Sequence, residues 1–238
     1  MLTDFHCHIL PGIDDGSCSV DESVQMLRKE WEQGIGTVVA TPHFYPRHDT
    51  PERFLYRRQQ AVEQLSGASA GENLPQVVVG AEVHYFPGMS DSDALSQLTI
   101  GGNQYILIEM PMPPWSEKMY AELVAVYEKQ NLIPVIAHID RYVAPLQTFR
   151  IPQRLAQLPV LVQANSSFFT QKATAGLAFR LLREEKVHLL GTDAHNLTDR
   201  APNMKDALDA IRKKMGTEIL QQIHGFELQV LGRQKTEI

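Results

Sequence analysis

The chain has 238 residues, of which 43% are hydrophobic and 21% charged, and these proportions suit one globular domain over residues 1–238 with a buried core. Its formal net charge of -6 argues against general nucleic-acid binding, which needs a basic face. No apolar run reaches the ~18–20 residues of a membrane span, and the first residues lack the basic and apolar regions of a signal peptide. The two cysteines, Cys7 and Cys18, form no CxxC motif, so we expect a cytoplasmic protein without disulfides.

Strands and helices are predicted to alternate along the chain. Apolar, mostly β-branched runs predict strands at 2–6, 37–41, 76–80, 104–108, 132–137, 159–162 and 187–190. Helical spacing and helix-start signals predict helices at 21–34, 50–65, 116–130, 172–186, 203–215 and 217–223. In the first helix, Val24, Leu27 and Trp31 recur at spacings of three and four. In the second, Thr50 precedes a proline at the first helical position, Pro51.

The alternation of strands with helices indicates βαβ units and a parallel sheet. About seven strands in one domain favour an α/β fold of the distorted, TIM-like (β/α)7 barrel type over an open doubly wound sheet. No GxGxxG motif follows the first strand, which lowers the case for a dinucleotide-binding domain.

Residues that commonly bind metals follow the predicted strands. His6 and His8 are two apart on the first strand, so their side chains point to the same face, while Cys7 points to the other. The full set consists of five imidazoles and four carboxylates: His6, His8, Asp15, His43, Glu82, Glu109, His138, Asp193 and His195. Because active sites of barrels are built at the carboxyl ends of their strands, we expect these side chains to converge there.

This donor set predicts hydrolysis by water that divalent cations activate. Nine ligands are too many for one or two ions and suit three, with a carboxylate bridging two of them. Nitrogen and oxygen donors without thiolate suit Mn, Fe or Zn and do not select among them. A single HxH pair could instead be structural, and Glu109 alone could be a salt-bridged carboxylate.

Of the remaining histidines, His188 and His224 are expected to be structural or solvated. His48 and His84 lie near predicted ligands and could line the pocket, although exposed loop positions are favoured for both. Cysteine-phosphatase chemistry is excluded. It requires an arginine six residues after the nucleophile, and the residues at those positions are Ile13 after Cys7 and Val24 after Cys18. No GxSxG motif is present either. Cys7 is therefore expected to be a small buried core residue.

Two arginines follow predicted ligands closely. Arg141 lies three residues after His138, and Arg200 lies five residues after His195. A guanidinium group binds phosphate through two parallel hydrogen bonds and stays charged, so both residues are candidate phosphate ligands. Each could equally be a surface residue in a salt bridge.

Several motifs together resemble the PHP (polymerase and histidinol phosphatase) superfamily. They are His6-Cys7-His8, Asp14-Asp15-Gly16, Thr41-Pro42-His43, Gly80-Ala81-Glu82, the segment His138 to Tyr142, and Thr192-Asp193-Ala194-His195-Asn196. Within this superfamily the chain is similar to the bacterial metal-dependent protein-tyrosine phosphatases of capsule and exopolysaccharide gene clusters. The resemblance runs from residue 2 to about 204, and the segment after about 217 matches the family poorly.

The resemblance implies a (β/α)7 barrel, three metal ions (usually manganese) and hydrolysis of phosphotyrosine on a partner tyrosine autokinase, which regulates capsule or exopolysaccharide synthesis. It places His6, His8, Glu82 and Asp193 on a first ion; Glu82, Glu109 and His138 on a second; and Asp15, His43 and His195 on a third, with Glu82 bridging. Arg141 and Arg200 would hold the phosphate.

Three other functions stay open at this stage. The first is a small-molecule phosphatase of the same superfamily, similar to histidinol phosphatase. The second is a nuclease, against which the acidic net charge argues. The third is a regulatory module that keeps the metal site only as structure, and the complete set of nine ligands disfavours it.

Overall fold

The computed structural model describes residues 2–145 and 148–232, so the range 1–238 expected for the domain extends outside the described residues. The strands are β1 (Leu2–Cys7), β2 (Ile35–Ala40), β3 (His43–Phe44), β4 (Gln76–Val79), β5 (Glu82–His84), β6 (Tyr105–Glu109), β7 (Ile133–Ile136), β8 (Leu161–Asn165) and β9 (Leu189–Gly191). The α-helices are α1 (Val20–Glu32), α2 (Pro51–Ala68), α3 (Glu117–Gln130), α4 (Ile139–Val143), α5 (Arg150–Leu155), α6 (Ser167–Thr170), α7 (Ala175–Arg183), α8 (Met204–Met215) and α9 (Glu218–Val230). Short 3-10 helices, η1 (Met89–Asp91), η2 (Asp93–Gln97) and η3 (Ile100–Gly102), lie between β5 and β6.

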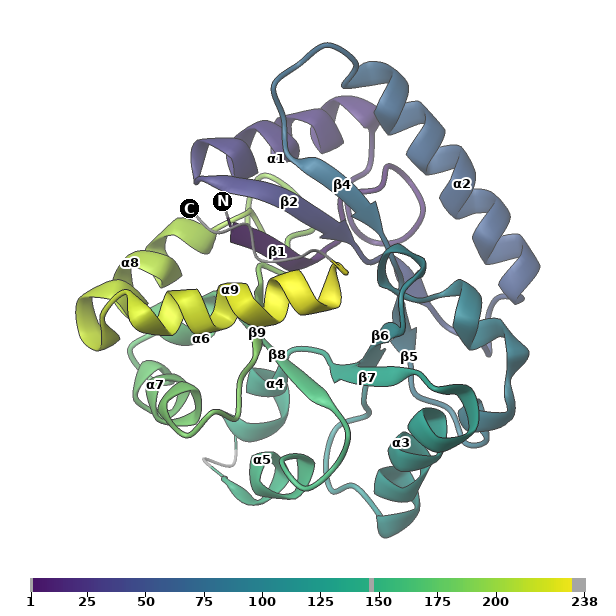
Figure 1. The fold of residues 1–238 in the computed structure, drawn as a ribbon. Helices are drawn as coiled ribbons and strands as arrows, with labels where there is room; N and C mark the ends of the chain where they lie inside the picture. The colour runs from purple at the N-terminus through teal and green to yellow at the C-terminus, as the bar shows by residue number, and fades with distance from the viewer. Residues whose placement is uncertain (1, 146–147, 233–238) are drawn as a thin grey trace.

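The paired strands are all parallel and follow one another around a barrel (Figure 1). β3 continues the path of β2 after a break at Thr41-Pro42, and β5 continues β4 after a break at Gly80-Ala81, since β2 pairs with β4 and β3 with β5. The barrel therefore has seven strand positions among the described residues. A bridge between Cys7 and Ala194 joins the segment after β9 to β1. The prediction of a distorted, TIM-like (β/α)7 barrel is confirmed.

Local signals explain where the long helices begin. The Ser19 side chain accepts a hydrogen bond from the Glu22 backbone N–H at 3.2 Å and caps α1. Thr50 caps α2 in the same way, through the Arg53 N–H at 3.3 Å. Each helix then buries one apolar face against the barrel, as the spacing in the sequence predicts.

Most predicted elements differ slightly in their bounds from the structure, and three differ most. The helix predicted at 172–186 spans only Ala175–Arg183, because Thr174 hydrogen-bonds the Phe168 and Gln171 carbonyl oxygens in a turn before it. The strand predicted at 159–162 is β8, Leu161–Asn165. The last helix extends to Val230 rather than ending at 223, because its second half packs on the barrel.

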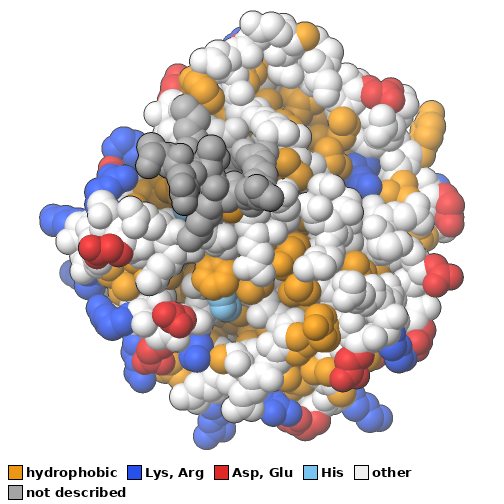
Figure 2. Space-filling view, in the orientation of Figure 1, with side chains coloured by type: hydrophobic (Ala, Val, Ile, Leu, Met, Phe, Trp, Pro, Cys, Tyr) orange, Lys and Arg blue, Asp and Glu red, His pale blue; other side chains and the backbone are white. Residues whose placement is uncertain are grey.

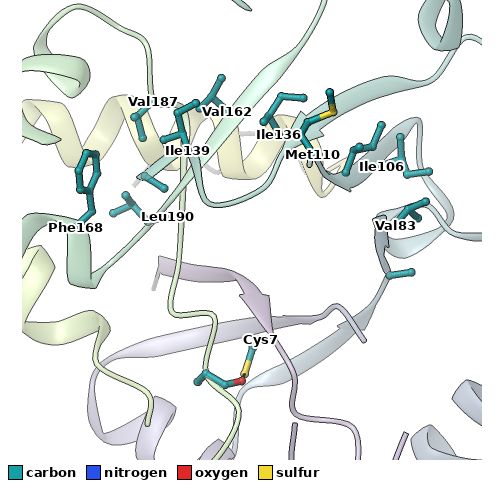
Figure 3. Packing of buried hydrophobic residues seen from close by; sticks show 14 of the residues in the cluster. Cys7, Val83, Ile106, Met110, Ile136, Ile139, Val162, Phe168, Val187 and Leu190 are labelled. Atoms are coloured by element: carbon teal, nitrogen blue, oxygen red, sulfur yellow. Dashed lines mark hydrogen bonds between the residues drawn. The ribbon is translucent and has the colours of Figure 1, made fainter. Parts of the chain in front are cut away.

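Alternating residues of the strands form two apolar layers. Outward-facing residues, including Ile106 and Ile136, pack under the surrounding helices (Figure 3). Inward-facing residues, including Phe5, Leu107 and Val135, form a second cluster inside the barrel.

Helix α9 closes the N-terminal end of the barrel. It lies in front of β1 and β9 in Figure 1 and packs on both strands. Val230 is fully buried in the inner cluster, and the Glu227 carboxylate accepts a hydrogen bond from the Thr3 N–H at 3.2 Å. The other end of the barrel, where the strands finish, is left for polar side chains.

On the face that α9 covers, lysine and arginine side chains gather at the edge where α8 lies (Figure 2). Among the described residues, none of the helices has the length and apolar character needed to cross a lipid bilayer.

Candidate metal centre

The first group of predicted ligands comes from β1, β5 and the segment after β9. His6 Nε2 and His8 Nε2 are 3.2 Å apart, which confirms that the two side chains share a face. Both nitrogens lie close to Glu82 Oε2, at 3.1 and 3.2 Å, and to Asp193 Oδ1, at 3.5 and 3.4 Å. Carboxylates from two distant parts of the sequence therefore lie beside the same two imidazole nitrogens, and the ligand atoms of His6, His8 and Asp193 are all within 4.8 Å of one another.

The second group shares Glu82 with the first. Glu82 Oε1 lies 2.7 Å from His138 Nε2, which is in turn 3.7 Å from Glu109 Oε1. The two carboxylate oxygens of Glu82 thus face different donor sets. His138 has a left-handed backbone with φ of 32°, a conformation that non-glycine residues rarely adopt and that recurs at functional sites.

The third group lies nearer the surface. Asp15 Oδ1 is 3.5 Å from both His43 Nε2 and His195 Nε2. The His8 and His195 rings stack with centroids 3.8 Å apart, so this group adjoins the first. The Asp15 side chain is 65% exposed, whereas that of His195 is 1% exposed, and the group therefore spans from the buried floor to solvent.

Both predicted phosphate-binding arginines lie at the rim of these groups. Arg141 contacts Glu109 Oε1 at 3.1 Å and Asp193 Oδ2 at 3.0 Å. Arg200 contacts Asp193 Oδ1 at 3.1 Å. Each guanidinium group bonds carboxylates of the centre while its side chain stays about one-third exposed, at 38% for Arg141 and 34% for Arg200.

Several buried nitrogen and oxygen atoms of the centre make no hydrogen bond within the part of the chain that the structure describes: Glu82 Oε2, Asp193 Oδ1, His43 Nδ1, His138 Nδ1 and His195 Nε2. Two of the oxygens have only ion-pair contacts, Glu82 Oε2 with imidazoles such as His43 at 3.0 Å and Asp193 Oδ1 with groups such as Arg200 at 3.1 Å. Burying an unpaired carboxylate or imidazole is costly in free energy unless a cation or another partner compensates. Oxygen and nitrogen atoms that converge in this way are the ligands that divalent transition metals prefer. The residues present therefore fit divalent metal ions.

The electrostatics favour ionised carboxylates in the centre. Burial acts to raise the pKa of Glu82, but His6 and hydrogen bonds from His138 and His43 hold that pKa well below its usual range. The pKa of Asp193 is likewise lowered by His6 and His8 against the effect of burial. Against the effect of burial, the same carboxylates raise the pKa of His6, and Asp14 raises that of His8. Burial, together with the charge of His8, lowers the pKa of His195 to about 4. Both carboxylates are therefore ionised and His195 is neutral near pH 7.

Some residues of the centre were missed from the sequence. The Asp14 carboxylate lies 2.7 Å from His8 Nδ1 and accepts the His43 N–H at 2.9 Å. Gln163 Oε1 lies 3.3 Å from His6 Nδ1 and accepts the His138 N–H at 2.6 Å. Partners of this kind fix the orientation of metal-binding imidazoles. A polar Gln163 within the apolar run of β8 was the available signal.

The four histidines outside the predicted ligand set have different surroundings in the structure. His84 lies in β5 rather than in the exposed loop that the sequence favours, and its Nδ1 is 3.0 Å from Glu109 Oε2, so the alternative that it lines the pocket is the one confirmed. His188 is structural as predicted: its Nδ1 accepts the Val162 N–H at 3.0 Å, and burial lowers its pKa to about 4. His224 lies on α9, with Nδ1 2.9 Å from the Glu227 carboxylate, and His48 is exposed.

Comparison with known proteins gives relatives along nearly the whole chain. Tyrosine-protein phosphatase YwqE of Bacillus subtilis is 30% identical over 227 residues, which cover 92% of this chain and 87% of that protein. Tyrosine-protein phosphatase CpsB of Streptococcus pneumoniae is 28% identical over 237 residues, covering 93% and 94%.

Solved structures agree with this relationship. A structure from work on YwqE of Bacillus subtilis and CpsB of Streptococcus pneumoniae, described as unique metal-dependent tyrosine phosphatases, has a TM-score of 0.84 at 26% identity and covers 99% of this chain and 96% of that one. A variant organophosphorus hydrolase from Deinococcus radiodurans, at 14% identity and a TM-score of 0.57 over 97% and 92% of the chains, shares the fold alone. The family model for capsular polysaccharide synthesis, CpsB/CapC, matches residues 2–227, and this chain therefore belongs to the CpsB/CapC family.

Proposed function

We propose that this chain is a metal-dependent phosphoesterase, acting as a single catalytic domain, that hydrolyses phosphotyrosine on a bacterial tyrosine autokinase. The observation that carries the proposal is Glu82, whose two oxygens face two different groups of donors beside Arg141 and Arg200. Support for the substrate comes from relatives that are named tyrosine-protein phosphatases, and from the family's description as capsular polysaccharide synthesis. Action in the cytoplasm and regulation of capsule synthesis are part of the proposal.

The proposed cofactor is three divalent ions. Mn is the preferred metal, with Fe and Zn as the alternatives. His6, His8, Glu82 and Asp193 would hold the first ion; Glu82, Glu109 and His138 the second; and Asp15, His43 and His195 the third. Three clusters with ligand atoms within 4.8 Å of one another overlap these sets without coinciding with them: His6, His8 and Asp193; His8, Asp15, His43 and His195; and His43, Glu82 and Glu109. When bound, such ions lower the pKa of water toward neutral and offset the negative charge of a phosphate.

The protein's own residues orient the imidazoles and supply positive charge for the phosphate. Asp14 and Gln163 hold His8 and His6 through their second ring nitrogens. Arg141 and Arg200 are anchored on carboxylates and still partly exposed, so their free N–H groups can bind the non-bridging oxygens of a phosphate. These contacts strengthen as charge redistributes during displacement.

A tyrosine leaving group suits this site. Its phenol has a pKa of about 10, so its departure needs less help from a general acid than that of an alkyl alcohol. The chemistry proposed here needs no covalent phosphoenzyme, which agrees with the burial of Cys7 in the outer core.

The alternative of a small-molecule phosphatase is tested by substrate comparison. The metal-replete enzyme is assayed on a phosphotyrosine peptide and on histidinol phosphate, before and after treatment with EDTA. We expect higher kcat/KM on the peptide, complete loss with EDTA, and recovery with Mn. Higher kcat/KM on histidinol phosphate would favour the alternative, and EDTA-resistant turnover would contradict metal dependence.

A further inference from the structure

A groove opens beside the metal centre on the face where the strands end. It has a volume of about 820 Å³ and lies between the segments that follow β3, β5 and β6. Its lining includes Tyr45, Arg47, His48, Tyr85, Phe86 and Lys118. Because loops at the carboxyl ends of barrel strands hold substrates, a groove in this place suits the part of a substrate that does not react.

The groove and the metal centre share a wall. His84 lines the groove and contacts the proposed metal ligand Glu109 at 3.0 Å. Tyr45 also lines the groove, and its ring centroid lies 4.9 Å from that of His43 and 5.4 Å from that of His84. A chain bound with its phosphate at the centre would therefore continue directly into the groove.

The chemistry of the groove is aromatic at the wall and basic at the edge. Tyr45, Tyr85 and Phe86 are partly buried and present ring surface. Arg47 and Lys118 are exposed, and neither makes an ion pair or side-chain hydrogen bond with any described residue. The neighbouring Arg57, by contrast, is paired with Asp49. The groove thus keeps two free positive charges on a chain whose net charge is -6.

One carboxylate, that of Glu122, also lines the groove. It accepts a hydrogen bond from the Ser90 backbone N–H at 2.8 Å, so it is held by η1 rather than by either cation. Arg47 and Lys118 remain available to a ligand.

The recessed position of the centre limits what can reach it. His6, His8 and Glu82 are at most 1% exposed, so a phosphorylated side chain must extend into the barrel end from a flexible backbone. An extended peptide can do this while its neighbouring residues lie along a groove.

On the basis of the proposed phosphatase function, we propose that this groove binds an extended, acidic peptide segment next to the phosphotyrosine. The aromatic wall packs on the peptide, and Arg47 and Lys118 select carboxylate side chains there. Arg47 and Lys118 are specificity-determining residues that do not touch the reacting phosphate.

The test uses three phosphotyrosine peptides of equal length that differ only in their flanking residues, which are Glu, Gln or Lys. With the metal-replete wild-type enzyme at low salt, we expect kcat/KM about 10-fold higher for the Glu peptide than for the Gln peptide, and lowest for the Lys peptide. The preference should shrink as salt is added, because these charges are exposed. Equal kcat/KM for the three peptides would overturn the proposal.

A pair of double variants locates the effect. Arg47→Gln with Lys118→Gln should remove the preference by raising KM for the Glu peptide, with kcat unchanged. Arg183→Gln with Lys213→Gln, on α7 and α8, removes the same charges elsewhere and should keep the preference. Charge reversal, Arg47→Glu with Lys118→Glu, should invert the order of the Glu and Lys peptides. A preference that survives the first double variant would overturn the assignment to this groove.

p-Nitrophenyl phosphate, which has no flanking residues, separates this proposal from the proposed function. All the variants should hydrolyse it as the wild type does. If the wild type hydrolyses p-nitrophenyl phosphate, and its kcat/KM is the same for the three peptides, only the groove proposal fails. If it hydrolyses none of them, the phosphatase function itself fails.

Discussion

Strand β1 contributes to two buried polar clusters that lie on opposite sides of it. On the inner side, His6 and His8 meet Glu82 and Asp193, and the pKa values of both carboxyl groups are lowered. On the outer side, Asp4 and Cys7 meet Glu30 of α1, with ligand atoms within 4.8 Å of one another.

The two clusters are equally buried but differ in charge balance. Burial raises the pKa of Asp4 despite its hydrogen bonds with Thr192, and burial together with the neighbouring Asp4 carboxylate raises that of Glu30. No basic group among the described residues contributes to either shift. On the inner side, imidazoles and two arginines surround the carboxylates. The comparison teaches that burial alone does not prepare a carboxylate to bind a metal ion. Neighbouring groups that favour ionisation are needed as well.

An irregular pairing between β1 and β2 makes this double arrangement possible. The register shifts between Asp4 and Cys7. Regular alternation would place residues three apart on opposite faces, whereas here both side chains reach α1.

The largest expected effect is that of Glu82→Ala. The substitution removes a carboxylate from two groups of proposed ligands at once. We expect the first and second ions to bind more weakly and turnover to fall by about 1000-fold or more. Metal content measured by mass spectrometry should fall by more than one ion per chain, and circular dichroism should show a folded protein. A folded Glu82→Ala protein that retains all three ions would contradict the bridging role.

Arg141→Ala is expected to act on turnover without changing metal content. A lost charged contact to the transition state lowers kcat/KM on a phosphotyrosine peptide by roughly 30- to 1000-fold, equivalent to about 2–4 kcal/mol. Arg141→Lys should restore only part of this, since an ammonium group cannot make two parallel hydrogen bonds. Near wild-type kcat/KM in a metal-replete Arg141→Ala enzyme would remove Arg141 from the site.

The raised pKa of Glu30, on the outer side of β1, predicts how the stability of the fold depends on pH. Its raised pKa means that the folded chain binds more protons than the unfolded chain above pH ~4.5, so stability falls as pH rises from there toward the raised pKa. The slope reaches at most about 1.4 kcal/mol per pH unit for one proton. Glu30→Gln cannot titrate and should flatten the decline in Tm between pH 5 and 8.

The control for that measurement is Glu32→Gln, an exposed glutamate on the same helix. All proteins should be measured at one saturating Mn concentration, because metal binding itself depends on pH. A decline in Glu30→Gln as steep as that of the wild type would show that Glu30 is not protonated in the folded chain.

The smallest expected effect is that of Cys7→Ser. Cys7 is fully buried in the outer core, away from the proposed ligands, so turnover should stay within about twofold of the wild type. Stability should fall by about 1 kcal/mol, because a hydroxyl replaces an apolar thiol. A folded, metal-loaded Cys7→Ser protein without activity would show that the thiol takes part in the mechanism.

The sequence predicted the barrel and the residues that meet at its end for one physical reason. Each proposed metal ligand follows or ends an apolar run or lies in the acidic loop after β1, and parallel strands bring such positions together. Whether these residues bind metal stays a prediction.

Other features depend on contacts that a local pattern does not contain. Glu30 lies on a helix whose spacing resembles any amphipathic helix, and its burial follows from the position of Asp4. The second half of α9 is helical because Val230 fits the inner cluster, whose other buried members, such as Leu189, are distant in sequence. Gln163 contacts His6, although the two residues are 157 positions apart in the sequence.

The breaks between β2 and β3 and between β4 and β5 occur at the same level of neighbouring strands, with Ala40 paired to Val79 below them and His43 paired to Glu82 above. They divide the barrel into a lower tier of continuous apolar strands and an upper tier that carries the proposed ligands and the groove. A change in loop length after β3 or β5 acts on the upper tier without disturbing the packing of Val39 and Leu107 beneath it. Substrate preference can therefore diverge among related chains while the barrel below stays the same.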